Sequence, residues 1–329
     1  MAGMGKRMRP HTLTIPKPLI PVAGKPIVQW LVEDIIKVCS EKVDEVAFVV
    51  GNFGKEVEDN LLKIAEQAGA KGSIYYQQEP LGTAHAVLCA DAALKGKVVV
   101  AFADTLFRTD FKIDESQDGV IWVKKLEDPR QFGVVKVNGK NIITDFVEKP
   151  QTFVSDLAII GIYYFKDGEY LQKEMQYLLD NNIKDKGEYQ LTNALENMKQ
   201  KGYKFAPGTV IEWLDCGNKD ATVYTNQRML ELNKNKKLIS SSFRKENSVI
   251  IEPCFIDDNV AIINSVVGPY VSVGKNSKIL NSVVHNSIIQ NHTTITFSNI
   301  DNSMLGNYVE YKGVQKSLSI GDYSTHNPC

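Results

Sequence analysis

Long apolar runs are missing from this sequence. The longest of them, such as residues 98–103, are far shorter than the roughly 20 residues that a membrane-spanning helix needs. No stretch has the pattern of a secretory signal peptide. We therefore expect a cytoplasmic protein that has no membrane partner.

Paired cysteines are also missing. The five cysteines are scattered, and none belongs to a Cys-x-x-Cys pair: Cys39, Cys89, Cys216, Cys254 and Cys329. This spacing argues against a disulfide framework and against a zinc site, and it fits a reducing compartment.

An excess of charge of either sign is absent too, since the formal net charge is −1. The chain has no global field that would attract nucleic acid, so a polyanion has to be met by a local cluster of basic residues. We expect a small-molecule partner and no nucleic acid.

The composition that remains is ordinary for a globular protein, and a chain of 329 residues is long enough for two domains. Helical patterns alternate with apolar strands at residues 45–51, 73–77 and 98–103. This alternation predicts an α/β fold with a Rossmann-like, mostly parallel sheet that helices cover on both faces. Such sheets bind ligands beyond the carboxyl ends of their strands.

The middle of the chain changes character. Residues 132–137 and 141–147 predict a hairpin, because Asn138-Gly139 suits the two positive-φ positions of a tight turn. Further elements are predicted at residues 83–94 (helix), 157–165 (strand), 170–180 (helix), 190–201 (helix) and 219–233 (helix).

A third pattern follows a polar connector at residues 234–247. An aliphatic residue recurs about every sixth position: Ile250, Ile256, Ile262, Val267, Val273 and Ile279. Asn-Ser followed by two aliphatic residues recurs at Asn264, Asn281 and Asn286. This period is typical of a parallel β-helix, here of about four coils, and a run of ordinary short strands is the alternative. We expect a first domain at residues 1–235, a β-helix at 248–315 and a tail at 316–329.

The start of the chain is rich in glycine and basic residues. Gly3, Gly5, Lys6, Arg7 and Lys17 lie close together in sequence. Glycine lets successive N–H groups point at phosphate oxygens, while arginine and lysine supply positive charge. The pattern favours a triphosphate-binding loop, and the alternative is an ordinary turn.

Two aspartates stand where predicted strands end. Asp104 follows residues 98–103, and Asp215 follows Glu212-Trp213-Leu214. Carboxylates in such places can hold the Mg²⁺ ion that phosphoryl and nucleotidyl transfer require. A capping or strand-ending role is the alternative for each.

A series of short motifs occurs in one order along the chain: Gly3-x-Gly5-x-Arg7 with Pro16-Lys17, Gln77 with Gly82-Thr83-Ala84-His85-Ala86, Asp104, Gly133-Val134-Val135, Glu148-Lys149-Pro150, Gly161, Glu188 and Trp213-Leu214-Asp215. This series resembles that of the sugar-1-phosphate nucleotidyltransferases, which include glucose-1-phosphate thymidylyltransferase and the UDP-sugar pyrophosphorylases. The resemblance rests on these motifs. It covers nearly the whole chain and implies that the β-helix is left-handed.

The resemblance also implies three groups of site residues. Those that act in catalysis are Arg7, Lys17, Asp104 and Asp215, and the two aspartates share Mg²⁺. Those that bind the nucleotide are Gly3, Gly5, Lys6, Gln77, Gly82 and Thr83. Those that hold the sugar phosphate are Gly133, Glu148, Lys149, Gly161 and Glu188.

The implied activity joins a nucleoside triphosphate, with dTTP or UTP favoured, to a sugar 1-phosphate, with glucose 1-phosphate favoured, and releases pyrophosphate. The amide of Gln77 can offer a donor and an acceptor to a pyrimidine. The alternatives are a non-catalytic nucleotide-binding regulatory subunit, an enzyme like mannose-1-phosphate guanylyltransferase, and a bifunctional enzyme whose β-helix transfers an acyl group with His285 or His292 as base.

Two further expectations concern the ends of the fold. Family members reach the first loop from an apolar strand, whereas this sequence starts at Met1-Ala2-Gly3, so we expect the natural first strand to be missing. The ends of a β-helix present unpaired strand edges, so we expect a homo-oligomer.

Overall fold

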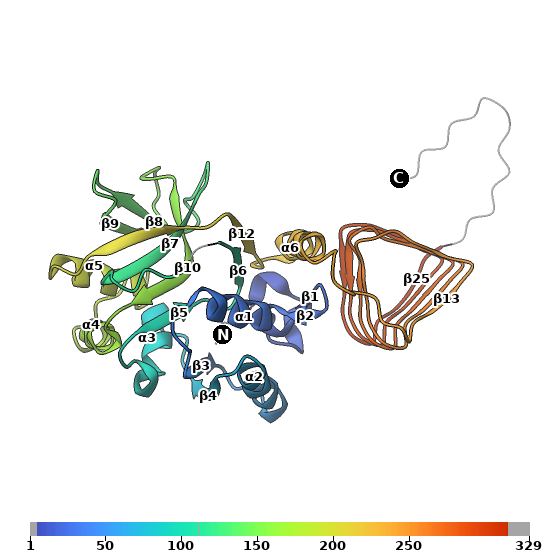
Figure 1. Ribbon diagram of the computed structural model, residues 1–329, viewed down its shortest axis with the longest axis horizontal. Coiled ribbons are helices and arrows are strands. Elements are labelled where there is room, and N and C mark those ends of the chain that lie inside the picture. The colour runs from blue at the N-terminus through green and yellow to red at the C-terminus, as the bar shows by residue number, and fades with distance from the viewer. Residues whose placement is uncertain (1–4, 111, 315–329) are drawn as a thin grey trace. The chain divides into compact units, whose positions relative to one another are not determined.

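The computed structural model describes residues 5–110 and 112–314 (Figure 1). The chain divides into two compact units, one made of Met1–Pro21 with Lys25–Thr222 and the other of Val22–Gly24 with Val223–Cys329. Helix α6 (Lys219–Leu232) contributes residues to both units. The predicted domain limits at residues 235, 248 and 315 stay predictions. Among the described residues, no helix combines the length and the apolar character that crossing a bilayer requires.

The first unit begins with short 3-10 turns at Lys6–Met8, His11–Leu13 and Lys17–Leu19. The two-residue strands β1 (Pro21–Val22) and β2 (Lys25–Pro26) then lead into helix α1 (Ile27–Val38). The strand β3 (Glu45–Val50) runs parallel to β4 (Lys71–Tyr76), and helix α2 (Lys55–Gln67) connects them.

The apolar faces of these elements form one core. Val28 and Val32 of α1 pack with Phe48 and Val50 of β3 and with Leu61 of α2. The pattern of apolar residues in the sequence predicts a strand, a helix and a parallel strand in this region. The structure has this arrangement, and the apolar side chains of each element are the ones that form the core.

A six-stranded sheet forms the centre of the first unit, with the order β11-β7-β10-β8-β9 and with β5 paired to β10. The strands are β5 (Val98–Ala101), β7 (Gly119–Lys125), β8 (Gly133–Val137), β9 (Ile143–Glu148), β10 (Leu157–Phe165) and β11 (Phe205–Thr209). β11 is parallel to β7, while β10 pairs antiparallel with β5, β7 and β8. Every residue of β10 except Leu157 is buried, as its nearly continuous apolar sequence requires.

Helices α3 (Thr83–Leu88), α4 (Gly168–Asp180) and α5 (Leu191–Gln200) pack on this sheet. The helix predicted at residues 83–94 is shorter than expected. After Leu88 the chain turns into a 3-10 segment, Asp91–Ala93. The side chain of Asp91 accepts the N–H of Ala92 at 2.7 Å, which competes with continued helical hydrogen bonding.

The predicted hairpin is present as β8 and β9, but the reason given for its turn was wrong. Asn138 and Gly139 are not among the positive-φ residues, and Asn141 is, with φ of 57°. The side chain of Asn138 instead accepts the N–H groups of Lys140 and Ile142 at 2.9 and 3.1 Å. The asparagine therefore shapes this turn through its side-chain amide and not through its backbone conformation.

The second unit contains a parallel β-helix, drawn in orange to red in Figure 1. Its strands form three parallel sheets of five, four and four members. The first sheet has β13 (Arg244–Glu246), β16 (Ala261–Ile263), β19 (Lys278–Leu280), β22 (Thr294–Thr296) and β25 (Glu310–Lys312); the second has β14 (Val249–Ile250), β17 (Val266–Val267), β20 (Val283–Val284) and β23 (Asn299–Ile300); the third has β15 (Phe255–Ile256), β18 (Ser272–Val273), β21 (Ser287–Ile289) and β24 (Ser303–Leu305).

The recurrent aliphatic residues of the sequence form the interior of this β-helix. Ile262, Ile279 and Ile295 are paired in register along one sheet, and all three are fully buried. The predicted α/β class of the first domain and the predicted parallel β-helix are both confirmed.

The Asn-Ser repeats at Asn247, Asn264 and Asn281 occupy the corner between the first and second sheets, while the repeat at Asn286 lies at another corner, between β20 and β21. Asn247, Asn264 and Asn281 all have positive φ, which asparagine tolerates better than most residues. Their side-chain amides are linked from coil to coil by hydrogen bonds of 3.0 and 3.2 Å. The hydroxyl of Ser265, next in sequence to Asn264, accepts the N–H of Ser282 on the following coil at 3.1 Å. The Asn-Ser repeat thus corresponds to a corner of the β-helix at which both the asparagine and the serine have a structural role.

Candidate active site

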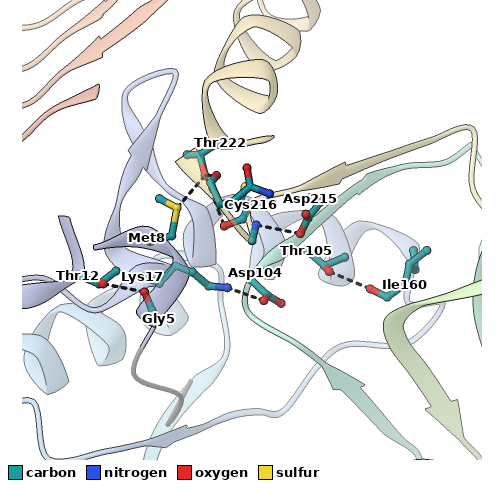
Figure 2. A network of polar contacts seen from close by, with 12 residues as sticks. Gly5, Met8, Thr12, Lys17, Asp104, Thr105, Ile160, Asp215, Cys216 and Thr222 are labelled. Carbon is teal, nitrogen blue, oxygen red and sulfur yellow. Dashed lines mark hydrogen bonds and ion pairs between the residues drawn. The ribbon is translucent and has the colours of Figure 1, made fainter. Parts of the chain in front are cut away.

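The glycine-rich loop closes on itself around Gly5. The carbonyl of Gly5 accepts the N–H of Met8 at 2.9 Å and the hydroxyl of Thr12 at 2.8 Å (Figure 2). Gly5 has φ of 54°, and a Cβ there would lie 3.0 Å from a methyl carbon of Thr12. Lys6 and Arg7 are exposed, so their charges are available to an anion. The predicted residue Gly3 lies outside the described residues.

The lysine of this segment reaches an aspartate from a distant part of the sequence. The Nζ atom of Lys17 lies 2.5 Å from Oδ2 of Asp104, and Figure 2 shows the two side chains pointing at each other. The Lys17 side chain is only 13% exposed and that of Asp104 34%, so water screens this ion pair less than it would a fully exposed pair. The fold thus joins two of the residues that were predicted to act in catalysis.

A small two-stranded sheet brings the second aspartate to the first. The strand β12 (Glu212–Asp215) pairs antiparallel with β6 (Thr105–Arg108), and Asp215 lies opposite Thr105. The N–H of Cys216 donates to the carbonyl of Asp104 at 2.9 Å. The hydroxyl of Thr105 donates to the carbonyl of Ile160 in β10 at 2.8 Å, which fixes this small sheet to the central one.

The two carboxylates influence each other electrostatically. Burial raises the pKa of Asp215 above its usual value, and the negative charge of Asp104 raises it further. The N–H of Gly217 and the positive charges of Lys17 and Arg7 act in the opposite direction. Because burial and the charge of Asp104 both disfavour the charged form of Asp215, a cation placed beside its carboxylate would stabilise that form.

The donor set at this point fits Mg²⁺. Mg²⁺ in nucleotide sites is commonly held by one or two carboxylates, together with phosphate oxygens and water. Asp104 and Asp215 supply two such carboxylates. Within residues 5–110 and 112–314, no cluster of three or more His, Cys, Asp or Glu side chains could hold a metal ion. Two carboxylates alone would need phosphate oxygens and water to complete the coordination of such an ion.

Arg7 lies near the same turn. A Cβ at Gly217 would come within 3.0 Å of both carboxylate oxygens of Asp215 and within 3.3 Å of Nη2 of Arg7. A side chain at position 217 would therefore crowd both the carboxylate of Asp215 and the guanidinium of Arg7, and these groups would have to shift. Arg7, Lys17, Asp104 and Asp215 therefore form one group, here called the charged cluster.

Gln77, predicted to read the base, follows β4 directly. Its Nε2 atom donates to the carbonyl of Gly82 at 3.1 Å and lies 3.0 Å from Nδ1 of His85. Gly82 has φ of 123°, and a Cβ there would lie 2.4 Å from the carbonyl oxygen of Tyr189. Glycine at position 82 is thus required by its backbone conformation and by the close approach of another segment.

Thr83, predicted among the nucleotide-binding residues, directs its hydroxyl at the protein. Its Oγ1 donates to the side chain of Gln190 at 3.1 Å and accepts the N–H of Leu191 at 2.9 Å. Leu191 is the first residue of α5, so Thr83 satisfies an N–H group that has no partner within the helix. The side chain connects α3 to α5.

The residues predicted to hold the sugar phosphate centre on Glu148. Gly133 lies opposite Glu148 in the β8–β9 pair, and a Cβ there would be 3.1 Å from its carboxylate. Nζ of Lys149 lies 3.3 Å from Glu148 Oε1, and the hydroxyl of Thr192 donates to Oε2 at 3.4 Å. Lys149 has φ of 41°, so its backbone is in the left-handed region.

Two further predicted residues have close partners of their own. The carbonyl of Gly161 accepts the N–H of Phe102 at 2.8 Å, and a Cβ at this glycine would lie 2.9 Å from the Phe102 ring. Gly161 therefore allows β10 to approach the segment that leads to Asp104. The carboxylate of Glu188 accepts the side-chain amide of Gln190 at 3.0 Å.

Some contacts in the site were not predicted. Thr192 was not identified, and neither was Lys186, whose Nζ donates to the carbonyl of Lys149 at 2.9 Å. His85 stood in a quoted motif but was given no role. Its position next to the Gly82-Thr83 pair was the only signal in the sequence, since the contact with Gln77 depends on the fold.

Known proteins resemble this chain in sequence and in fold. The model of the nucleotidyl transferase family matches residues 1–231. The chain is 30% identical to the low-salt glycan biosynthesis nucleotidyltransferase Agl11 of Haloferax volcanii, over 92% of this chain and 90% of that protein. It is 28% identical to a glucose-1-phosphate thymidylyltransferase of Streptomyces antibioticus, over 94% of this chain and 91% of that protein.

A solved structure shares the fold. The crystal structure of a UDP-glucose pyrophosphorylase complexed with UDP-glucose superposes with a TM-score of 0.57 and 23% sequence identity, and it covers 70% of this chain and 96% of that one. The family model matches well over half of the sequence, and the Haloferax protein aligns with nearly all of it. The chain therefore belongs to the nucleotidyl transferase family.

Proposed function

We propose that this nucleotidyltransferase condenses dTTP or UTP with a sugar 1-phosphate, glucose 1-phosphate in particular, and releases pyrophosphate. The observation that carries the proposal is the charged cluster, in which Lys17 meets Asp104 at 2.5 Å beside Asp215 and Arg7. Positioning and charge neutralisation are what such a transfer needs most.

In the proposed reaction, an oxygen of the sugar 1-phosphate attacks the α-phosphorus of the nucleoside triphosphate. The new P–O bond forms as the bond to the bridging oxygen breaks, and pyrophosphate leaves with the negative charge. A covalent intermediate with the protein is not required. The increase in reaction rate comes from holding the two anionic substrates in line and from stabilising the charge that develops on the leaving group.

Each member of the charged cluster has a role in this proposal. Arg7 offers a planar fork of donors to the triphosphate, and Lys17 places an ammonium at the reacting phosphate. Asp104 and Asp215 would hold Mg²⁺, which supplies neutralisation of phosphate charge when it is bound. Gly5 and Lys6 would contact the triphosphate, and Gly3 belongs to the same proposal from the sequence alone.

The remaining predicted residues are proposed to bind the base and the sugar phosphate. Gln77 and Gly82 would contact the base, and Thr83 would support them by connecting α3 to α5. Glu148, Lys149, Gly133, Gly161 and Glu188 would surround the sugar phosphate. The relationship to a glucose-1-phosphate thymidylyltransferase supports the choice of dTTP and glucose 1-phosphate.

A substrate panel tests the proposal. The four common nucleoside triphosphates and dTTP are each combined with glucose, mannose and N-acetylglucosamine 1-phosphates at saturating Mg²⁺, and pyrophosphate release is measured. We expect the highest kcat/KM for dTTP or UTP with glucose 1-phosphate. GTP with mannose 1-phosphate as the best pair would favour the guanylyltransferase alternative. Nucleotide binding without turnover of any pair would favour the regulatory subunit.

The β-helix histidines have structural partners. Nδ1 of His285 lies 2.5 Å from the carbonyl of Gly268, and the ring of His292 stacks on Tyr308 at 4.7 Å between centroids. Both imidazoles are thus used in contacts between coils, which gives little support to an acyltransferase activity. Formation of an acylated sugar from acyl-CoA would be needed to revive that alternative.

The proposal also covers the oligomeric state of the protein and its cellular compartment. β13 and β25 stand at the two ends of the five-stranded sheet, and each pairs with one neighbour among the described strands. Such edges can accept a strand from another chain. We propose a cytoplasmic homo-oligomer, and light scattering coupled to size exclusion, which gives the molar mass in solution, tests the oligomer.

A further inference from the structure

The side-chain amide of Gln77 is held by two acceptors, one directly before a short helix and one within it. Gly82 precedes α3, and its carbonyl oxygen, which can only accept, lies 3.1 Å from Nε2 of Gln77. This contact fixes which end of the amide is nitrogen. The second proton of Nε2 points at Nδ1 of His85, 3.0 Å away. Nδ1 must then be the acceptor, so the neutral imidazole of His85 carries its proton on Nε2.

The two acceptors are themselves fixed. The carbonyl of Gly82 also accepts the N–H of Ala86 at 3.0 Å, within α3. The N–H of Ala84 donates to the carbonyl of Tyr189 at 2.9 Å, and Thr83 connects α3 to α5 as described above. His85 and Gly82 therefore belong to a helix that is tied down on a second side, and they cannot follow Gln77 if its amide rotates.

The orientation of Gln77 has a chemical consequence. Both of its N–H groups are used, so Oε1 is the polar atom left for a ligand. Across the part of the chain that the structure describes, no hydrogen bond to a protein group ends on Oε1. Gln77 is only 8% exposed, so rotation of its amide would leave donors and acceptors mismatched in a nearly buried place.

We propose that His85 is a positioning residue that selects the base, by holding Gln77 so that it presents an acceptor. The inference rests on the proposed nucleotidyltransferase function. An acceptor facing the ring edge of a pyrimidine pairs with the N3–H of uracil or thymine. In cytosine, N3 carries a lone pair instead, and the two acceptors repel. With Nδ1 removed, only the carbonyl of Gly82 still opposes rotation of the Gln77 amide, so turning its donor toward cytosine costs one mismatched hydrogen bond fewer.

UTP and CTP are the most direct pair for the test, because the two bases differ only at N3 and at position 4. We measure kcat/KM for both, at saturating glucose 1-phosphate, in wild type, His85→Phe and His85→Asn. Phenylalanine keeps the ring and loses the acceptor, whereas asparagine can place Oδ1 near the position of Nδ1. Thermal unfolding of each variant controls for loss of fold, and His85→Leu replaces His85→Phe if that variant does not fold.

We expect the ratio of kcat/KM for UTP to that for CTP to fall about tenfold in His85→Phe, the scale of one mismatched buried hydrogen bond. In His85→Asn the ratio should stay near the wild-type value. In a Gln77→Leu background, His85→Phe should no longer change the ratio. A purely structural role would lower both activities together and leave the ratio as it is.

Three outcomes separate this inference from the function on which it rests. An unchanged ratio in an active, folded His85→Phe protein overturns the role of His85 and leaves the enzyme activity standing. A ratio that falls equally in His85→Asn and His85→Phe also overturns it. If the wild type turns over no substrate pair, the proposed function fails, and Kd values for UTP and CTP measured by calorimetry then test the base selection directly.

Discussion

The backbone N–H of Cys216 donates to the carbonyl of Asp104 at 2.9 Å and so joins the two segments that carry the paired aspartates. Asp104 directly precedes β6 and Asp215 is the last residue of β12, and the antiparallel register brings these ends together. The spacing of the two carboxylates is therefore set by main-chain hydrogen bonds, which do not depend on the side chains that a mutation at either position removes.

The first prediction concerns Asp104. We expect Asp104→Asn to lower kcat by about 100-fold or more, because the carboxylate is proposed to hold the cation that neutralises phosphate charge and it also orients Lys17. Pyrophosphate release at saturating Mg²⁺ is the measurement. Asp301→Asn, which changes an exposed aspartate of the β-helix unit in the same way, should keep the wild-type rate. Near-normal turnover in Asp104→Asn would remove Asp104 from the metal site.

The second prediction follows from the raised pKa of Asp215. A carboxyl group whose pKa is higher in the folded than in the unfolded protein binds its proton more tightly when folded. Stability is then lost as the pH rises through the window between the two values. We expect Asp215→Asn to unfold at a higher temperature than the wild type at neutral pH, since its neutral amide avoids the burial and the repulsion by Asp104 that raise this pKa. The same variant should have lost its activity.

Calorimetric melting at several pH values checks this trade-off. The difference in melting temperature between Asp215→Asn and wild type should shrink as the pH falls, because protonation gives the wild type a neutral side chain as well. A variant that is less stable than wild type at neutral pH would show that Asp215 is already compensated by Lys17 and Arg7.

The third prediction concerns Gly82. Gly82→Ala combines a φ of 123° with a Cβ 2.4 Å from the carbonyl oxygen of Tyr189, so we expect it to cost about 1–3 kcal/mol of stability and to weaken nucleotide binding. Urea denaturation and calorimetric titration with UTP are the measurements. Gly139→Ala is the matched control, because no atom lies within 4 Å of its added Cβ. Equal effects at the two glycines would contradict the close approach of Tyr189.

The fourth prediction separates support from ligand contact at Thr83. Thr83→Val removes the hydroxyl that binds Gln190 and Leu191, so it should lower stability by about 1 kcal/mol. Thr83→Ser should behave like the wild type. Neither variant should change the preference between UTP and CTP by more than about twofold, well within the effect of one hydrogen bond. A selective loss of one nucleotide in Thr83→Val would return this residue to the base-binding group.

The fifth prediction uses the asparagine corner of the β-helix. Asn264 has positive φ and hydrogen bonds to Asn247 and Asn281, so Asn264→Ala should lose about 1–2 kcal/mol. Asn264→Gly keeps the backbone freedom and loses only the side-chain bonds, so we expect it to lie between alanine and wild type. Thermal melts followed by circular dichroism give the order. Glycine less stable than alanine would indicate that backbone strain at this corner is negligible.

The sequence predicted two candidate carboxylates near strand ends, where sheets of this kind carry polar residues. The structure places Asp104 between β5 and β6, and Asp215 is the last residue of β12. The β-helix was predicted from its period, because each buried aliphatic residue returns to the same sheet one coil later.

Other features depended on tertiary contacts and could not be predicted. The hydroxyl of Thr83 turns toward Leu191, more than a hundred positions away in sequence, and no local pattern indicates that. The contact between Gln77 and His85 requires the chain to turn back after β4 before α3 begins. The hairpin turn was misjudged because the side chain of Asn138 competes for the N–H groups that a tight Asn-Gly turn would leave free.

The asparagines stacked at one corner of the β-helix recur at a regular spacing in the sequence. Asn247, Asn264 and Asn281 follow one another at intervals of 17 residues, and the amide of Asn264 accepts a hydrogen bond from Asn247 and donates one to Asn281. The next coil is one residue shorter, since Ile279 pairs with Ile295, 16 positions later, and both side chains stay buried. Removing or duplicating a whole coil would leave every corner and every interior position in phase. The β-helix can thus change in length by whole coils, and it also tolerates a difference of one residue between coils as long as the buried positions stay in register.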